Sequence, residues 1–243
     1  MEVNYLLQLY EQRKTDFAGV DLRGADLRRV TLIGVNLVGA KMMGANLRRA
    51  FLTQADLSNA ELNWADLSFV KFSDGNLTKA DLTKANLSGA FLVQSNFNGA
   101  KLSGVNFSDA NCYQANLSQA NLCGANLQGI NLRGANLRGA DLRWANLSGA
   151  RLSGSCLQGT LMTGTNLSRA YLNGVDLEGL DLEGVNLSEA KLNYANLHNA
   201  NLQSANLSWA ILRNSQLNGA NLTNANLKGT ILDQQDHQTN IPH

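Results

Sequence analysis

Two adjacent stretches decide the fold: Ala-Asn-Leu-Arg-Gly at residues 135–139 and Ala-Asp-Leu-Arg-Trp at residues 140–144. Each contains a small apolar residue, an amide or acidic residue and a leucine, followed by two variable residues. Steps of five residues from this leucine, called the centre of the repeat below, extend the pattern from Phe17 to Leu232 without an insertion or a deletion. An internal repeat of this regularity predicts one solenoid, in which each unit stacks on the next.

Two positions of the repeat are consistently apolar. Of the forty-four centres, thirty-seven are Leu, and the residue two positions earlier is Ala in twenty-seven repeats. Neither position ever carries a charge, although the chain has twenty basic and nineteen acidic residues. Such segregation indicates that both positions face a core. The centres that are not Leu are also apolar or a thiol: Phe17, Met42, Phe72, Phe97, Phe107, Cys112 and Met162.

The spacing of these two positions favours short strands over a helix. Side chains two residues apart share one face of a strand, whereas steps of five advance by ~140° around an α-helix and scatter the leucines. Twenty-one of the twenty-two glycines lie two residues after a centre, Gly75 being the exception, and glycine there permits a tight corner. Four right-angle corners would close a coil of twenty residues, although a period of five does not by itself fix the number of sides.

Together with Ala-Asn-Leu-Thr-Asn at residues 220–224, these stretches resemble the A(D/N)LXX motif of the pentapeptide-repeat family. The resemblance covers residues 15–234 in one register and has a cyanobacterial character. It implies an all-β fold, a right-handed quadrilateral β-helix of about eleven coils at four repeats per coil. With ~4.8 Å between coils, residue n lies over residue n+20 in a rod ~50 Å long. Ile130 and Leu180, larger than the usual Ala, are expected to bulge outward.

The two ends of the chain lie outside the repeat. In residues 1–14, Val3, Leu6, Leu7 and Tyr10 are spaced for one apolar helical face, which predicts an N-terminal helical cap on the first coil. A membrane-binding helix is the alternative, although the segment is short and not basic. Residues 235–243 are expected to form a polar flexible tail. The last coil is then open to coverage by this tail or by a partner, and we expect a monomer or a weak end-to-end dimer.

Composition and motifs argue against several classes of protein. A formal net charge of +1 gives no strong attraction to nucleic acid or to an anionic membrane. No apolar stretch is long enough to span a bilayer, and the N-terminus lacks the features of a signal peptide. The three cysteines, Cys112, Cys123 and Cys156, suit neither a disulfide framework nor a zinc site, which favours the cytoplasm. No catalytic motif is present, so no catalytic, cofactor-binding or metal residue is assigned and no cofactor is expected.

The outward-facing positions carry the candidate contact surface. One column at twenty-residue spacing contains five large apolar residues: Phe51, Phe91, Tyr171, Ile211 and Ile231. Exposed apolar patches often mark protein contacts, although strand propensity alone also explains such residues. Basic residues form two further groups. A collar on successive sides of one coil contains Arg133, Arg138 and Arg143, and two columns near the N-terminus contain Arg28, Arg48, Arg29 and Arg49. Binding of an acidic partner and ordinary solvation both account for them.

These features favour a non-enzymatic scaffold that binds an unidentified protein partner, with a regulatory role. The family resemblance offers an alternative, because some members mimic duplex DNA and inhibit or protect DNA gyrase or a related topoisomerase. Such mimicry needs dense negative charge, whereas acidic and basic residues nearly balance in this chain. An enzyme ranks third, since the convex side of a rod offers no cleft for catalysis.

Overall fold

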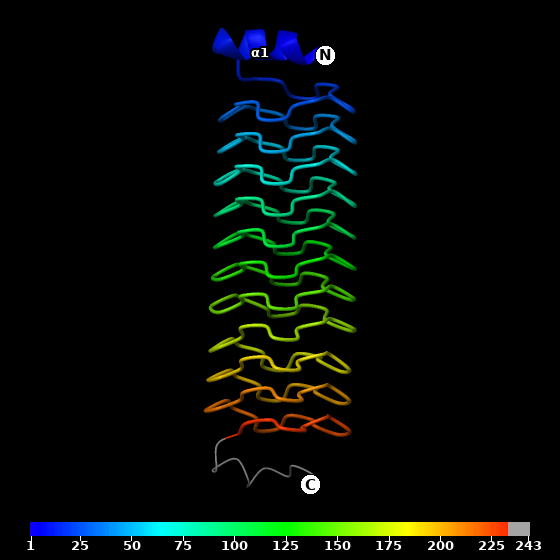
Figure 1. Cartoon of the computed structure of the whole chain (residues 1–243), viewed down its shortest axis with the longest axis vertical. Coiled ribbons are helices and arrows are strands. Elements are labelled where there is room, and N and C mark those ends of the chain that lie inside the picture. Colours follow the sequence, from blue (N-terminus) through cyan, green and yellow to red (C-terminus); the bar gives the residue numbers. More distant parts are fainter. Residues whose placement is uncertain (233–243) are drawn as a thin grey trace.

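The computed structural model describes residues 1–232, which form a rod of stacked coils with one helix, α1, lying across its N-terminal end (Figure 1). Isolated parallel β-bridges join residues twenty apart, from Asp16 and Asn36 at one end to Ile211 and Ile231 at the other. These pairs confirm the expected register of residue n over residue n+20. Within the described residues the bridges do not extend into longer strands, and the count of about eleven coils stays a prediction.

Backbone hydrogen bonds tie each side of a coil to its neighbours. The N–H of Phe17 donates to the carbonyl of Asn36 at 2.8 Å, and the N–H of Asn36 donates back to the carbonyl of Thr15 at 2.8 Å. At the corner, the N–H of Gly19 donates to the carbonyl of Val38, also at 2.8 Å. This pattern uses nearly every main-chain donor, so a proline would remove a ladder bond. The one proline of the chain, Pro242, lies outside the repeats.

Every corner between residues 19 and 229 has its second residue after the centre in the left-handed region. The centre carbonyl accepts a hydrogen bond from the N–H three residues on, as from Ala25 to Leu22 at 3.1 Å, in the pattern of a type II turn. Glycine adopts this conformation freely, as at Gly19 with φ 68°. Roughly half of the corners carry other residues, including Trp64 at φ 57°, at a cost of about 1–2 kcal/mol each. Core packing and the ladder therefore impose the turn.

The core contains the two inward positions that the sequence predicts. Every centre from Phe17 to Leu217 is at most 6% exposed. The rings of Phe97 and Phe107 meet edge to face, with their centroids 5.7 Å apart. Gly75, the one glycine outside the corner register, lies against the ring of Phe72, where a Cβ would overlap that ring. A large centre is therefore accommodated by a missing side chain three residues later.

The expectation that Ile130 and Leu180 bulge outward is wrong. Ile130 is fully buried and Leu180 is 6% exposed. In the register of the coils, Ile130 lies between Ala110 and Ala150, whose small side chains leave room for it. Leu180 has no such room, because residue 160 above it is a buried threonine.

The backbone ladder is interrupted next to Leu180, between residues 154–164 and residues 173–183. In the described part of the chain, the N–H groups of Gly159 and Met162 donate no hydrogen bond to the next coil, and the bridge from residue 161 to residue 181 is missing, whereas the bridge from residue 156 to residue 176 remains. Intact bonds flank the gap, such as that from Leu167 to Asn186 at 2.7 Å. At the inward position two residues before the centre, Ser or Thr in this coil lies over Val or Leu in the next coil. In the rest of the rod, Ala usually lies over Ala at this position. We call this interruption the seam and attribute it to crowding by these larger side chains.

Helix α1 (Val3–Glu11) lies within the segment 1–14 that the sequence predicts to be helical. Its Leu6 is fully buried against the core. The hydroxyl of Tyr10 donates to the carbonyl of Ile33 at 3.2 Å and accepts from the N–H of Ile33 at 3.1 Å. The carbonyl of Ile33 thereby gains a donor that a preceding coil supplies to the equivalent carbonyl elsewhere, as Gly19 does for Val38. The predicted polar tail, residues 235–243, lies outside the described residues.

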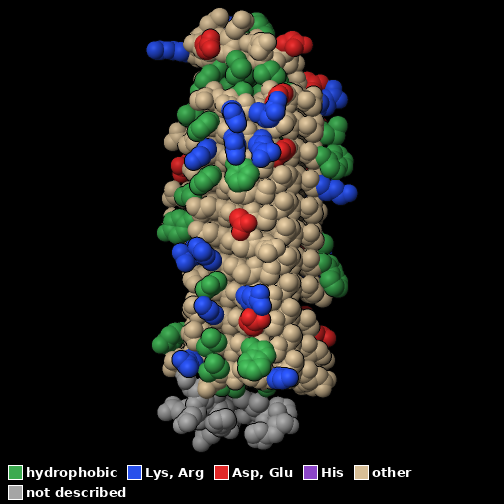
Figure 2. Space-filling view, viewed as in Figure 1, with side chains coloured by type: hydrophobic (Ala, Val, Ile, Leu, Met, Phe, Trp, Pro, Cys, Tyr) green, Lys and Arg blue, Asp and Glu red, His purple; other side chains and the backbone are tan. Residues whose placement is uncertain are grey.

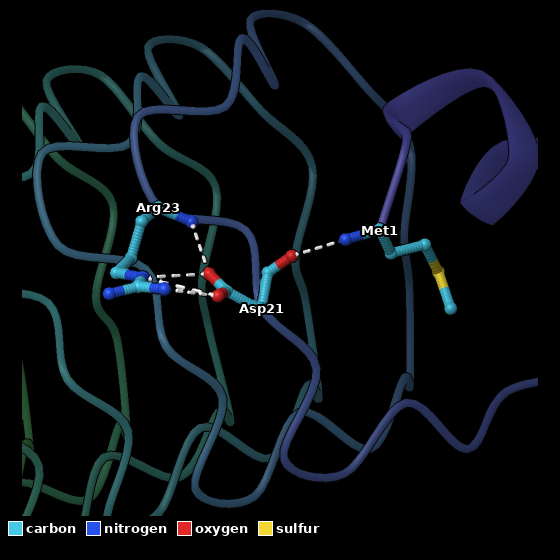
Figure 3. Close-up of polar contacts among 3 residues, drawn as sticks. All are labelled: Met1, Asp21 and Arg23. Carbon is cyan, nitrogen blue, oxygen red and sulfur yellow. Dashed lines mark hydrogen bonds and ion pairs between the residues drawn. The ribbon is translucent and has the colours of Figure 1, made fainter.

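The N-terminal amino group also reaches the first coil (Figure 3). It donates from Met1 to the carbonyl of Asp21 at 2.6 Å. The Arg23 side chain binds the Asp21 carboxylate and holds the pKa of that group well below its ordinary range. Helix α1 and the first coil are therefore joined at two sides, through Tyr10 and through Met1.

Candidate interaction surface

The column that contains the predicted apolar residues runs along one side of the rod. Bridges connect its members in steps of twenty, from Thr31 to Ile231. Phe51 is 44% exposed, Phe91 42% and Tyr171 39%. Polar residues at 111, 131 and 151 divide the column, so its apolar residues gather in two groups. The N-terminal group contains Phe51 and Phe91, and the C-terminal group contains Tyr171, Ile211 and Ile231.

The N-terminal group belongs to an open groove with a volume of about 340 Å³, which we call the phenylalanine groove. A third ring enters it from the corner beside the column, because Phe69 is held in the left-handed region at φ 58° and is 41% exposed. The ring of Phe69 lies over Gly89, which has no side chain to displace it. The groove is lined by Phe51, Phe69 and Phe91 together with Arg29, Arg49 and Lys71.

Cations lie over two of these rings. Nζ of Lys71 is 4.1 Å from the centroid of the Phe91 ring. Cζ of Arg49 is 5.6 Å from the centroid of the Phe69 ring, and Cζ of Arg48 is 6.0 Å from it. Cation–π contacts at exposed sites contribute about 0.5–1 kcal/mol each. They place positive charge at the rim of the groove and hold the rings in position.

A hollow of about 610 Å³ adjoins the groove and is lined by the arginine cluster, Arg28, Arg29, Arg48 and Arg49, with Asp26. Arg29 and Arg49 line both spaces. Figure 2 shows basic side chains gathered near α1 with hydrophobic side chains beside and below them. The groove and the cluster are therefore one continuous surface.

The arginine cluster is only partly neutralised. Arg28 pairs with Asp26 at 2.6 Å and lowers the pKa of that carboxyl to about 2. Within residues 1–232, Arg29, Arg48 and Arg49 form no ion pair. Like charges at a separation near that of neighbouring coils repel by about 1 kcal/mol per pair in water. An anion bound between them would relieve this repulsion.

The C-terminal group of the column has a different character. Nζ of Lys191 lies 4.6 Å from the centroid of the Tyr171 ring, and Ile211 pairs with Ile231 in adjacent coils. Ile231 is 40% exposed, while Ile211 is half-buried. This group presents aliphatic and aromatic surface without a concentration of charge.

The arginine collar forms no patch. Arg133, Arg138 and Arg143 are all exposed and lie on successive sides of the rod. Arg143 pairs with Asp141 at 2.6 Å, and Nε of Arg138 donates to the side-chain oxygen of Gln158 at 3.1 Å. The structure therefore keeps these three residues apart, which agrees with their register.

The described residues contain neither a candidate metal site nor a membrane-spanning helix. Within residues 1–232, no group of three or more His, Cys, Asp or Glu side chains is placed to hold a metal ion. Over the same range, no helix has the length and apolar character needed to cross a bilayer. Cys112 is fully buried and belongs to the core. Burial raises the pKa of its thiol.

A family model described as pentapeptide repeats matches the chain in eight copies. The matched residues are 13–49, 44–74, 76–112, 115–154, 150–188, 165–203, 181–219 and 200–234. This chain is a pentapeptide-repeat protein. The proteins of this family fold as right-handed quadrilateral β-helices, which agrees with bridges between residues twenty apart and with four five-residue sides per coil.

Solved structures of other pentapeptide-repeat proteins are similar to this one. HetL, involved in heterocyst differentiation regulation in the cyanobacterium Nostoc sp. strain PCC 7120, is 33% identical over 96% of this chain and 98% of its own, with a TM-score of 0.51. Rfr23 from the cyanobacterium Cyanothece 51142 is 20% identical over 95% of both chains, with a TM-score of 0.24. QnrB1, a plasmid-mediated fluoroquinolone resistance protein, is 20% identical over 90% of this chain and 92% of its own, with a TM-score of 0.31. A comparison with curated proteins gives no match.

Sequence reasoning about this pentapeptide-repeat protein missed Phe69. The column of Phe51 and Phe91 was recognised from the twenty-residue register, and so were the arginine columns. Phe69 is the next member of the column that contains Arg29 and Arg49. It lies at a corner, two residues before Lys71 of the apolar column. Adjacency across that corner is the signal that could have revealed the groove.

Proposed function

We propose that this pentapeptide-repeat protein is a non-enzymatic scaffold that binds another protein through the apolar column on one side of the rod. The observation that carries the proposal is the alignment of Phe51, Phe91, Tyr171 and Ile231 on one side, each 39–44% exposed. Burial of such a side chain contributes about 1.5–3 kcal/mol. A partner that covers several of them gains affinity without ordering the rod, because the hydrogen-bonded coils already fix the column.

The likeness to HetL supports a regulatory role for the scaffold, since that protein is involved in the regulation of differentiation. The arginine collar, Arg133, Arg138 and Arg143, is a secondary candidate contact on this proposal. We place the protein in the cytoplasm, which is supported by three cysteines that are all free thiols.

The test is capture of a partner from native extract by wild-type protein and by a variant with Phe51, Phe91, Tyr171 and Ile211 changed to Ser. We expect a protein captured by the wild type to be lost by this variant, as measured by quantitative mass spectrometry. Leu161→Ser is the matched control, because Leu161 is 51% exposed on a different side. Equal capture by all three proteins would rule out the column as the contact.

The surface charge favours the scaffold over the DNA-mimic alternative. A DNA mimic needs a dense row of carboxylates, whereas the most concentrated charge described above is the arginine cluster. We expect the protein to leave the supercoiling activity of DNA gyrase unchanged. Inhibition at micromolar concentration would reverse the order of the two functions.

A further inference from the structure

We propose that the arginine cluster and the phenylalanine groove together bind an acidic segment of a partner protein that carries a large apolar side chain. This inference deepens the scaffold function proposed above and rests on it. It assigns the contact to the N-terminal part of the apolar column and specifies the chemistry of what binds there.

The charge of the partner follows from the unneutralised arginines. Arg29, Arg48 and Arg49 lack an ion pair within residues 1–232, and Lys71 adds a fourth cation at the rim of the groove. Guanidinium groups bind carboxylates through paired hydrogen bonds. Two or more carboxylates on one segment would therefore reduce the repulsion between arginines in adjacent coils.

The apolar anchor follows from the groove itself. Its volume of about 340 Å³ is at the small end of ligand pockets, and its walls are three phenylalanine rings. Such a space fits one or two side chains. Because Arg29 and Arg49 line both the groove and the hollow, an apolar side chain and its neighbouring carboxylates can bind at the same time. Apolar anchors in pockets with polar surroundings are typical of binding hot spots.

The extent of the basic surface favours a peptide over a nucleic acid. A duplex or a single strand is held by a stripe of basic residues along several phosphates. Here the arginine cluster occupies two adjacent coils, and the apolar column continues with Phe91 and two asparagines. The short basic surface, bordered by aromatic rings, matches a short acidic segment.

The experiment measures binding of fluorescent twelve-residue peptides to the full chain by fluorescence anisotropy. One peptide alternates Glu with Phe, a second replaces Phe by Ser, a third replaces Glu by Lys, and a twelve-nucleotide oligothymidylate is the nucleic-acid probe. We expect the Glu–Phe peptide to bind at least about ten-fold more tightly than each of the others. Its affinity falls as salt is raised, since the arginine contacts are screened.

Variants locate the site. We expect Arg29→Ala with Arg49→Ala, and separately Phe51→Ser with Phe91→Ser, to weaken binding of the Glu–Phe peptide by about ten-fold or more. The matched control is Lys79→Ala with Lys84→Ala, which removes the same charge from exposed corners on other sides of the rod and should change affinity by less than about two-fold. Circular dichroism checks that every variant keeps the fold.

Each outcome supports or overturns the inference. Equal binding of the Glu–Phe peptide to wild type and to the arginine variant overturns it, as does tighter binding of the oligothymidylate. The scaffold function fails separately. If the native partner is captured by wild type and equally by the arginine variant, the scaffold stands and this site is wrong. If no partner depends on the apolar column, the scaffold itself fails.

Discussion

Three aromatic residues at corners lie over glycines of the next coil. A Cβ at Gly89 would overlap the ring of Phe69, and one at Gly164 would overlap the ring of Trp144. Trp209 and Gly229 repeat the arrangement. The residue twenty positions on therefore determines whether an aromatic side chain at a corner can lie against the next coil. The choice of residue at one corner thus depends on a residue that is distant in the chain.

The pair of Phe72 and Gly75 gives a test of core packing. We expect Gly75→Ala to lower the free energy of unfolding by about 1–3 kcal/mol, because the new Cβ overlaps the Phe72 ring. The double change Phe72→Leu with Gly75→Ala restores the commonest residues of the repeat and should recover most of that loss. Denaturation in urea measures both. An equally large loss in the double variant would show that the ring is not the cause.

The ion pair of Asp26 and Arg28 gives a prediction about pH. Arg28 lowers the pKa of Asp26 to about 2, so in the folded protein the carboxylate persists to lower pH than in the unfolded chain. Its stabilising contribution is therefore present above the ordinary pKa and is lost as pH falls through about 2. NMR titration of the Asp26 carboxyl should show this low pKa, which returns toward the ordinary value of about 3.9 in Arg28→Ala. No change in that variant would contradict the assigned cause.

At the scale of elements, α1 is the one helix within residues 1–232 and lies where the first coil would otherwise expose its apolar end and its main-chain groups. Tyr10 and Leu6 hold it there through a hydroxyl contact and through burial. We therefore propose that residues 1–14 act as a cap that prevents pairing of the first coil with another molecule.

The cap is tested by Leu6→Asp, which places a charge at a fully buried position and should release α1 from the core. We expect the variant to self-associate with increasing concentration, as measured by sedimentation, because the uncovered coil pairs with a second copy. Gln8→Asp adds the same charge at an exposed position of α1 and should remain like wild type. A monomeric Leu6→Asp variant would remove the need for a cap.

At the scale of the whole molecule, the seam divides an otherwise continuous ladder. We expect the amide hydrogens of Gly159 and Met162 to exchange with solvent at least about ten-fold faster than those of Gly139 and Leu142 in the coil before, because the former make no hydrogen bond to a neighbouring coil. Native-state hydrogen exchange measures the difference. Thr160→Ala with Leu180→Ala should close the seam and slow exchange, and equal rates in all four amides would refute the interruption.

The sequence predicted the parts of this fold that depend on one repeat at a time. The period and the inward positions follow from the centres, the register of twenty follows from the resemblance to the pentapeptide-repeat family, and a helix in residues 1–14 follows from the spacing of Leu6 and Tyr10. The outward expectation for Leu180 was wrong because its side chain is buried beside an interruption of the backbone ladder. Phe69 and the role of Gly75 were missed, since both depend on contacts across a corner or within the core.

Pairing of residues twenty apart also limits how this rod can change length. A duplication of twenty residues adds one full turn and returns every downstream side chain to its original direction. A duplication of five rotates all downstream columns by a quarter turn, which would move Tyr171 and Ile211 off the side that carries Phe51. Lengthening by whole turns therefore preserves a binding side that spans the rod, whereas lengthening by a single repeat dismantles it.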